Sequence, residues 1–239
     1  MTWRQPAGAF VSSAIIVTLS THGAASSEET LRIAFQNGVA NDWAAGVERG
    51  VHFGVREAAH TGALLGRGIE LVAPSSAGHV PVIGVGRETV FIRVNRDAAC
   101  RFDVVPSAAR RKRAVTDWMA RNGAIDTAEA DSLDAVPWHP HLARFGASEL
   151  NERFTRATGK PMTASEWSGW VAVKALAEAF FRRSPESSLC KSLQSVRIDA
   201  HKGRPIRFDS SERELRQTLV IVRDGKIVGE VDPWSEAKQ

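Results

Sequence analysis

The chain has 239 residues, of which 43% are hydrophobic and 24% charged, and its formal net charge is +4 at pH 7. This composition is typical of a packed globular protein and excludes a disordered, fibrous or low-complexity chain. The small positive charge does not by itself indicate a nucleic-acid partner.

Residues 1–25 have the pattern of a secretory signal peptide. Arg4 precedes an apolar stretch at residues 9–19, and the sequence Gly23-Ala24-Ala25 satisfies the small-x-small rule for cleavage. We therefore expect cleavage near Ala25 and export to the periplasm, with an uncleaved anchor as the alternative. The apolar stretch is shorter than the roughly 20 residues that span a bilayer, and no later segment is longer, so we expect no stable membrane insertion. Export also argues against a nucleic-acid partner.

Residues 31–72 predict a strand, a loop, a long helix, a glycine-rich turn and a second strand. Apolar residues alternate with others at positions 31–35, and the loop Gln36–Asp42 follows. A stripe at helical spacing comes next, formed by Trp43, Val47, Val51, Val55 and Ala58. The turn Gly66-Arg67-Gly68 then leads into a strand at residues 69–72. This order is that of a βαβ unit, and open α/β sheets bind ligands at the carboxyl ends of their strands.

Residues 80–85 and 89–94 predict two further strands. Only a short loop separates residues 72 and 79, whereas a parallel neighbour needs a crossover of about a dozen residues or more. We therefore expect a compact or partly antiparallel sheet. Residues 107–122 predict an amphipathic helix that ends at Gly123, with Val115, Trp118 and Met119 facing inward. Its basic run, residues 110–113, is interpreted as a solvated face, with an anionic partner as the alternative.

The second half of the chain begins with residues 125–151, which show weak periodicity and predict a linker with irregular structure. Thr163 and Glu166 then form a capping box that starts a long helix ending near Arg183, which we expect to be buried against a sheet. Residues 215–222 and 226–231 predict a hairpin joined at Asp224-Gly225. The acidic residues Asp209, Glu212 and Glu214 are interpreted as a solvated turn, because their spacing is not that of a calcium loop.

The candidate ligand-binding residues come from two loops that follow predicted strands. If the strands are parallel, both loops face one crevice. Helix-start amides and an arginine suit an anionic group there. The alternative is that Asp42 is an N-cap and Trp43 a core residue. The candidates are Gln36, Asn37, Asp42 and Trp43 from the first loop, and Gly84, Gly86 and Arg87 from the second.

Two other sets of residues indicate metal or disulfide chemistry. In an extended segment His139 and His141 point to the same side, and with Asp134 they form a candidate metal site. Two imidazoles alone do not complete a site of three protein ligands, so an ordinary structural segment is the alternative. Cys100 and Cys190 form a disulfide or remain as two buried free thiols, and both interpretations stay open here.

Motifs for catalysis and nucleotide binding are missing from the sequence. It has no G-x-S-x-G elbow, no H-E-x-x-H, no C-x-x-C and no Walker lysine, and Gly84-x-Gly86 lacks the third glycine of a dinucleotide fingerprint. We therefore expect a protein that is not an enzyme and that has no cofactor.

Several separated blocks of sequence resemble one family of proteins. The phrase GVERGVHFGVREAAHTGALLGRGIELV at residues 46–72 looks like the opening of type I periplasmic binding proteins, the branched-chain amino-acid receptor family. Other blocks resemble the subfamily encoded beside pyrroloquinoline-quinone-dependent alcohol dehydrogenases. These blocks are Cys100-Arg101-Phe102, Val105-Pro106-Ser107, Phe145-Gly146-Ala147, Leu150-Asn151, Arg153-Phe154, Met162-Thr163, Trp167, Trp170-Val171-Ala172-Val173, Lys202-Gly203 and Leu215-Arg216-Gln217.

The resemblance implies an α/β fold with a Rossmann-like lobe and, because the chain is shorter than its relatives, a reduced second lobe. We expect an N-terminal lobe at residues 26–105, a shortened second-lobe or linker region at 106–150, and a helix packing back on the first lobe plus a C-terminal hairpin at 151–239. The blocks expected to be missing lie between Val72 and His79 and between Gly123 and Asp134, where the family has most of its amino-acid contacts. Amino-acid binding is therefore not carried over.

In function, the resemblance implies the substrate-binding component of an ABC transporter, which binds an unidentified small-molecule ligand without covalent chemistry. Its expected partners are an ABC permease or components of a quinoprotein dehydrogenase system that oxidises alcohols such as methanol. The alternatives are a reduced accessory protein of that dehydrogenase system that binds other proteins but no ligand, or a metal-binding protein.

Overall fold

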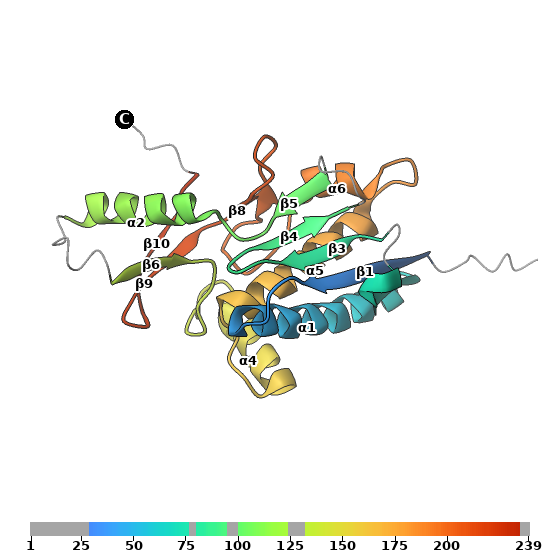
Figure 1. Ribbon diagram of the computed structural model, residues 1–239, viewed down its shortest axis with the longest axis horizontal. Helices are drawn as coiled ribbons and strands as arrows, with labels where there is room; N and C mark the ends of the chain where they lie inside the picture. The colour runs from blue at the N-terminus through green and yellow to red at the C-terminus, as the bar shows by residue number, and fades with distance from the viewer. Residues whose placement is uncertain (1–28, 77–79, 95–99, 124–131, 235–239) are drawn as a thin grey trace, which may run out of the picture.

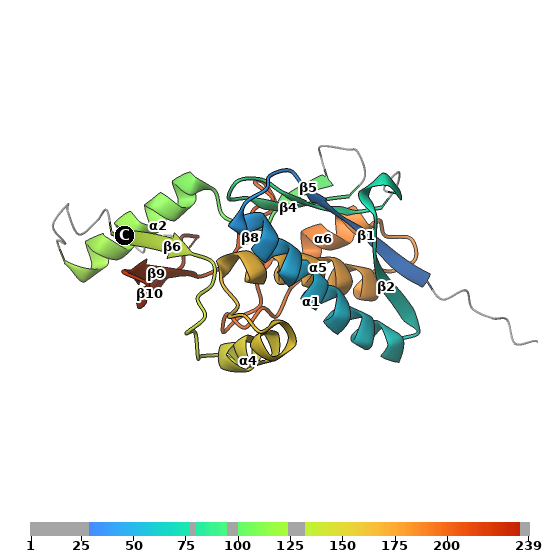
Figure 2. The same cartoon turned by 60° about the horizontal axis from the view of Figure 1, so that its bottom comes forward.

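The computed structural model describes residues 29–76, 80–94, 100–123 and 132–234. The expected signal peptide, residues 1–25, lies outside these ranges. Within them the chain forms a five-stranded and a three-stranded β-sheet that lie side by side, together with one two-stranded pair, and helices cover one face of the largest sheet (Figures 1 and 2). None of the helices in the described ranges combines the length and the hydropathy that crossing a bilayer requires.

The larger sheet has five strands in the order β2-β1-β3-β4-β5. Its strands are β1 (Glu29–Asn37), β2 (Arg67–Val72), β3 (Val82–Val85), β4 (Val90–Arg93) and β5 (Arg101–Asp103). β1 is parallel to β2 and to β3, whereas β4 and β5 are antiparallel additions. The expectation of a partly antiparallel sheet is therefore confirmed. β2 and β3 lie on opposite sides of β1, and the link between them includes the 3-10 turn η1 (Pro74–Ser76), which lies against β1.

The helices α1 (Asp42–Leu64) and α5 (Ala164–Arg182) pack against each other and cover one face of this sheet (Figure 1). Their backbones are in direct contact through glycines. A Cβ built on Gly50 would lie 1.9 Å from the carbonyl oxygen of Glu166, and one on Gly169 would lie 2.2 Å from that of Val47. Only glycine allows so close an approach, so α5 lies mainly on α1 and secondarily on β3 and β4.

The predicted capping box of α5 is confirmed and also joins the two helices. The Glu166 side chain accepts a hydrogen bond from the Thr163 backbone N–H at 3.0 Å, and the Nη2 of Arg49 on α1 donates to Glu166 Oε1 at 2.6 Å. Burial of Glu166 raises its pKa, but hydrogen bonds from Thr163 and Arg49 outweigh this and lower the pKa below its usual value. The carboxylate therefore stays charged and holds both helix starts together.

The smaller sheet has the order β10-β9-β6 and is entirely antiparallel. It consists of β6 (Leu133–Val136), β9 (Leu219–Arg223) and β10 (Lys226–Val231), and α2 (Ala108–Asn122) packs on it. Its separate apolar core includes Ala114, Leu133 and Ile221, with Trp118 half-buried beside them. The predicted end of α2 at Gly123 is confirmed, since Gly123 follows the last turn with φ +87°, and the Ser107 side chain caps the first turn.

The predicted hairpin is confirmed at its turn, where Asp224 and Gly225 have φ +50° and +72°. Its first strand is shorter than expected. Leu215 pairs with Phe208 as part of β8 (Leu215–Arg216) and β7 (Arg207–Phe208), and a new strand begins at Leu219. The interruption falls at Gln217, whose Nε2 donates to the Val104 carbonyl at 3.1 Å.

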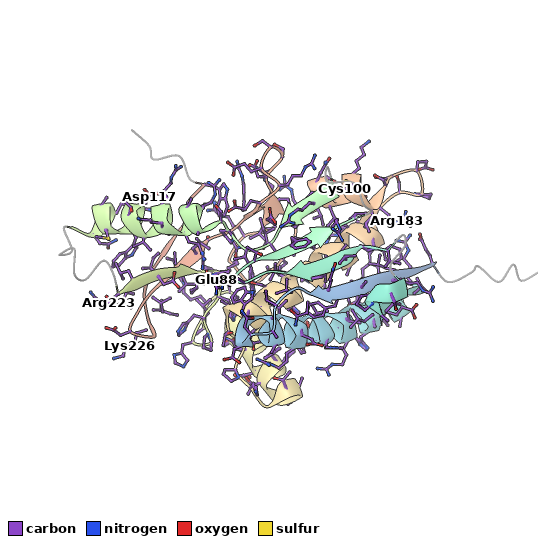
Figure 3. The ribbon with its side chains drawn as sticks, in the orientation of Figure 1. Glu88, Cys100, Asp117, Arg183, Arg223 and Lys226 are labelled. Carbon is purple, nitrogen blue, oxygen red and sulfur yellow. A yellow bond between two sulfur atoms is a disulfide. The ribbon has the colours of Figure 1, made fainter. Side chains whose placement is uncertain are left out.

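The predicted linker at residues 125–151 is wrong for its described part. It contains strand β6, and α4 (Ala147–Thr158) begins inside it after Gly146, which has φ +77°. Residues 124–131 lie outside the described ranges. Farther along the chain, α6 (Leu189–Ser195) carries Cys190, which forms a disulfide with Cys100 at a Cα–Cα distance of 5.8 Å (Figure 3 marks Cys100). This bond joins α6 to the start of β5.

The basic run of α2 and the acidic turn that follows β7 contradict the expectation of solvated charges only in part, because Lys112, Arg113 and Glu212 are exposed as expected. Arg110 forms ion pairs with Glu212 and Glu214, and only 15% of its side chain is exposed. Arg111 is exposed by 18%. Asp209 is buried and accepts hydrogen bonds from Ser211 and from the Glu212 backbone, which lower its pKa. Half of the basic run therefore contacts acids that are distant in sequence.

Candidate functional site

A cavity of about 560 Å³ lies between the larger and the smaller sheet. α1 and α5 both begin on the side that faces β6 (Figures 1 and 2), so the N-terminal ends of two helices border this cavity. The positive ends of helix dipoles favour anions. The lining residues are Asn41, Asp42, Trp43, Arg87, Glu88, Arg111, Asp134, Val136, Pro137 and Ala164.

Three of the seven predicted ligand-binding residues line this cavity: Asp42, Trp43 and Arg87. The structure thus brings together the loop before α1 and the turn between β3 and β4, as the parallel pairing of β1 and β3 requires. The alternative interpretation of Asp42 as an N-cap is wrong, because Asn41 is the cap and its Oδ1 accepts from the Ala44 N–H at 2.9 Å.

The other four predicted residues, Gln36, Asn37, Gly84 and Gly86, are not among the lining residues. Asn37 accepts a hydrogen bond from the Val39 N–H at 3.0 Å, which fixes the loop. A Cβ on Gly84 would lie 2.2 Å from Phe91, and one on Gly86 would lie 2.5 Å from Thr89 Oγ1. These two glycines therefore serve packing and the turn.

An ion pair that the sequence did not predict crosses the cavity. The Nη2 of Arg111 on α2 lies 2.7 Å from Glu88 Oε2 in the turn between β3 and β4. Figure 3 shows Glu88 between the two sheets. The pair ties the smaller sheet to the larger one at the mouth of the cavity. A local sequence pattern could not have revealed this ion pair, because Arg111 lies on the helix that packs on the smaller sheet and Glu88 lies in a turn of the larger sheet.

Two donors at the cavity have no acceptor within the described part of the chain. The Nε1 of Trp43 is buried and makes no hydrogen bond. The side chain of Arg87 is exposed, and no hydrogen bond or ion pair to another described residue engages its guanidinium. A buried N–H without a partner costs about 1–3 kcal/mol, and a ligand acceptor would recover this free energy once the Trp43 ring turns its N–H toward the cavity.

The predicted metal set is not assembled. No three His, Cys, Asp or Glu side chains come together as a metal site anywhere in the described ranges. His139 and His141 are neighbours, but the Nε2 of His139 lies 3.1 Å from the Gly225 carbonyl and its Nδ1 accepts from the His141 N–H. Burial lowers the pKa of His139, and the Gly225 carbonyl opposes this only in part. Asp134 lines the cavity instead.

A buried lysine supports the cavity from behind. The Nζ of Lys202 donates to the carbonyl oxygens of Pro137 and Thr218, and Pro137 is itself a lining residue. The ammonium lies 5.0 Å from the ring centroid of Trp167 and 5.5 Å from that of Trp138. Lys202 therefore fixes the segment that leaves β6 relative to the core of the larger sheet.

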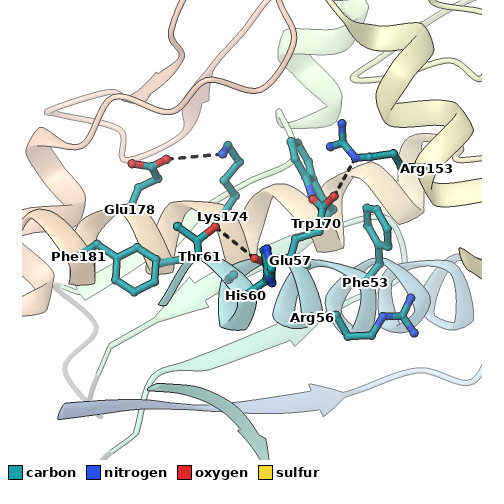
Figure 4. A pocket seen from close by; sticks show the side chains of 13 residues that line it. Phe53, Arg56, Glu57, His60, Thr61, Arg153, Trp170, Lys174, Glu178 and Phe181 are labelled. Atoms are coloured by element: carbon teal, nitrogen blue, oxygen red, sulfur yellow. Dashed lines mark hydrogen bonds and ion pairs between the residues drawn. The ribbon is translucent and has the colours of Figure 1, made fainter. Parts of the chain in front are cut away.

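A different cavity, of about 530 Å³, lies on the groove between α1 and α5, and none of the predicted site residues line it (Figure 4). Glu57 stands at its centre and accepts from Trp170 Nε1 at 2.8 Å and from Arg153 Nε at 3.0 Å. Its other acid, Glu178, lies 3.5 Å from Lys174. The acids in this groove are thus already paired, and its charge is mixed.

Scans against protein-family models and a search of curated proteins give no match for this chain. Solved structures do match. A solute-binding protein of an ABC transporter from Rhodopseudomonas palustris BisB5, in complex with 3,4-dihydroxybenzoic acid, has a TM-score of 0.58 and 9% identity over 86% of this chain and 98% of that chain. An ABC transporter substrate-binding protein from Desulfitobacterium hafniense has a TM-score of 0.55 and 13% identity over 85% and 100%.

A third neighbour is a putative branched-chain amino acid ABC transporter protein from Rhodospirillum rubrum, with a TM-score of 0.53 and 12% identity over 84% of this chain and 99% of that chain. At these identities the comparisons establish the fold. The chain has the mixed α/β fold of these three ABC-transporter proteins, which is the fold class expected from the resemblance to type I periplasmic binding proteins.

Proposed function

We propose that this protein is the periplasmic solute-binding component of an ABC importer and that it holds a small organic anion in the cavity between its two sheets. The observation that carries the proposal is the position of this cavity: it lies where β1 and β3 end and where α1 and α5 begin. Ligands of open α/β folds bind at this edge, and helix N-termini favour negative charge.

The unpaired donors support an anionic ligand. Arg87 offers a guanidinium fork that fits a carboxylate, and the Nε1 of Trp43 offers a second, buried N–H. The acids of the cavity restrict where the anion binds, because Glu88 already occupies Arg111, and the carboxylates of Asp42 and Asp134 repel an anion placed beside them. A carboxylate between Arg87 and Trp43 is the arrangement that leaves the fewest polar groups unpaired.

The experiment is isothermal titration calorimetry of the protein lacking residues 1–25 with a panel of small acids. Because the Rhodopseudomonas palustris neighbour was solved with 3,4-dihydroxybenzoic acid, the panel contains aromatic acids beside short aliphatic ones. We expect saturable binding of at least one acid. Arg87→Gln should weaken it about tenfold or more and Trp43→Phe about three- to tenfold, in proportion to the hydrogen bond removed.

The matched control is Arg113→Gln, which removes one exposed charge from α2 outside the cavity. It should leave the affinity unchanged. If no acid binds, or if Arg113→Gln weakens binding as much as Arg87→Gln, the cavity is not the site of an anionic ligand. The absence of solute binding would then favour the alternative function, that of an accessory protein that binds other proteins.

The proposed partners are an ABC permease and, from the resemblance of several sequence blocks, a system that oxidises alcohols through a quinoprotein dehydrogenase. Closure of two lobes around a solute is the signal that an importer reads. We expect the solute-loaded protein, and not the solute-free one, to retain its detergent-solubilised permease on an affinity column. Equal retention of both forms would contradict this role.

A further inference from the structure

A cavity of about 420 Å³ that shares no lining residue with the cavity between the sheets is lined by four arginines. Three regions of the chain converge on it: Arg197 and residues 204–207 at the start of β7, residues 216–218 from the end of β8 to the residue before β9, and residues 232 and 234 after β10. Figure 1 shows β8 between the larger sheet and the strands β9 and β10 of the smaller one.

The charge of this cavity is strongly positive. Arg204 pairs with Asp232, and Arg216 pairs with Asp209. The other two, Arg197 and Arg207, are engaged in no hydrogen bond or ion pair with the side chains that the structure describes. Two guanidinium charges therefore remain after the carboxylates are counted, and like charges gathered on one cavity repel each other unless an anion lies among them.

Buried donors without acceptors point to the same ligand charge. The Nε1 of Trp234 and the Nε of Arg216 are both buried, and neither has a hydrogen-bond partner within the described ranges. Both residues line the cavity. An oxyanion in the cavity would meet the exposed guanidiniums of Arg197 and Arg207 directly, and would accept from these two buried N–H groups once their side chains turn toward it.

We propose that this cavity binds an organic phosphate monoester. A phosphate monoester carries a charge near −2 at neutral pH and three terminal oxygens, which matches the two arginines that have no carboxylate partner among the described residues. A free phosphate ion would leave most of a 420 Å³ cavity empty. Pro205 and the indole of Trp234 line the remaining space and provide an apolar surface for the organic part.

The site lies on a segment that connects the two sheets. Gln217 is a lining residue, and its Nε2 donates to the Val104 carbonyl, which belongs to the other connection, between β5 and α2. A bound phosphate ester would therefore join residues 197–207, whose buried members belong to the larger core, to the residues that follow β10. This inference does not depend on the ligand of the cavity between the sheets.

The experiment is isothermal titration calorimetry at constant ionic strength with phenyl phosphate, inorganic phosphate and succinate. We expect phenyl phosphate to bind saturably and about tenfold or more tightly than either of the other two. The double variant Arg197→Gln/Arg207→Gln should lose about tenfold or more of this affinity. Neither arginine has a partner among the described side chains, and the cavity gathers like charges, so the ligand-free double variant should unfold at a thermal midpoint no lower than that of the unchanged protein.

Arg113→Gln is again the matched control, because it removes an exposed charge that lines none of the described cavities. It should leave the affinity for phenyl phosphate unchanged. The proposal is overturned if phenyl phosphate does not bind, or if succinate or inorganic phosphate binds as tightly as phenyl phosphate. It is also overturned if the double variant binds phenyl phosphate as tightly as the unchanged protein does. Loss of affinity in Arg113→Gln would show a nonspecific effect of net charge and would overturn it too.

Discussion

Lys202 carries a titratable group in the core where the two sheets meet. Its Nζ donates to two carbonyl oxygens, among them that of Thr218 at 3.0 Å, and it has no acidic partner within hydrogen-bond distance in the described ranges. Burial lowers the pKa of Lys202 to about 7, and the charge of Glu230 offsets this only in part. We predict that Lys202→Met makes the free energy of unfolding less dependent on pH between pH 7 and 9.

The sign follows from proton binding in the two states. An unfolded chain keeps the lysine proton until about pH 10.4, whereas folded Lys202 loses it above pH 7. The unfolded state therefore binds more protons in this interval, and the stability of the unchanged protein rises with pH. The limiting slope is about 1.4 kcal/mol per pH unit. Because Lys202 is half-titrated at pH 7, the gain between pH 7 and 9 is about 2 kcal/mol.

The assay is urea unfolding at pH 7, 8 and 9 with the disulfide intact. Lys202→Met also removes the donor for two carbonyls, so its stability differs at every pH and only the pH dependence is diagnostic. Lys226→Met is the matched control, since Lys226 is exposed in the hairpin and should keep the unchanged pH dependence (Figure 3). If the free energy of unfolding depends on pH in the same way in the unchanged protein and in Lys202→Met, the carbonyls and indoles keep Lys202 protonated up to pH 9. That result would refute the reasoning.

Two further predictions concern contacts that hold separate elements together. Gly50→Ala should lower the free energy of unfolding by about 1–3 kcal/mol, because its Cβ would lie 1.9 Å from the Glu166 carbonyl oxygen. Gly54→Ala, whose Cβ would have its nearest atom at 3.0 Å, should lower it by less. If urea unfolding gives equal losses for the two variants, α1 and α5 move apart without cost and the prediction is wrong. Removing the bond between Cys100 and Cys190, 90 residues apart, by a double change to Ser should cost about 4–5 kcal/mol in the chain-entropy model. Reductant should shift the unchanged protein to the same midpoint and leave the variant unaffected; a midpoint insensitive to reductant contradicts this prediction.

Elements with local signals at their ends were predictable from the sequence. The side chains of Thr163 and Glu166 each accept a hydrogen bond from the other residue's backbone N–H within one turn. Gly225 adopts its positive φ without steric cost. The long helix at residues 42–64 was equally clear, because its apolar stripe runs over several turns. β6 was missed because four residues give too short a pattern to separate a strand from a linker.

Features that depend on contacts between distant residues were not predictable. The glycines of α1 look like costs to a helix when the sequence is considered alone, and only the carbonyl of Glu166 beside Gly50 explains them. Lys202 has the residue type of an exposed position. Its burial depends on two carbonyls and two indoles that come from three other segments of the chain.

The candidate site also contains a contact between distant residues that the sequence did not predict, and this contact affects how the site would bind a ligand. The sequence placed Asp42, Trp43 and Arg87 correctly in one crevice because they follow adjacent strands, but it assigned Arg111 to solvent. In the structure Arg111 already holds Glu88. A ligand carboxylate that took Arg111 would have to displace Glu88 and would exchange one charged contact for another, at little net gain. The free energy and specificity of the proposed anion binding must therefore come from Arg87 and the Trp43 N–H, which have no contact to lose.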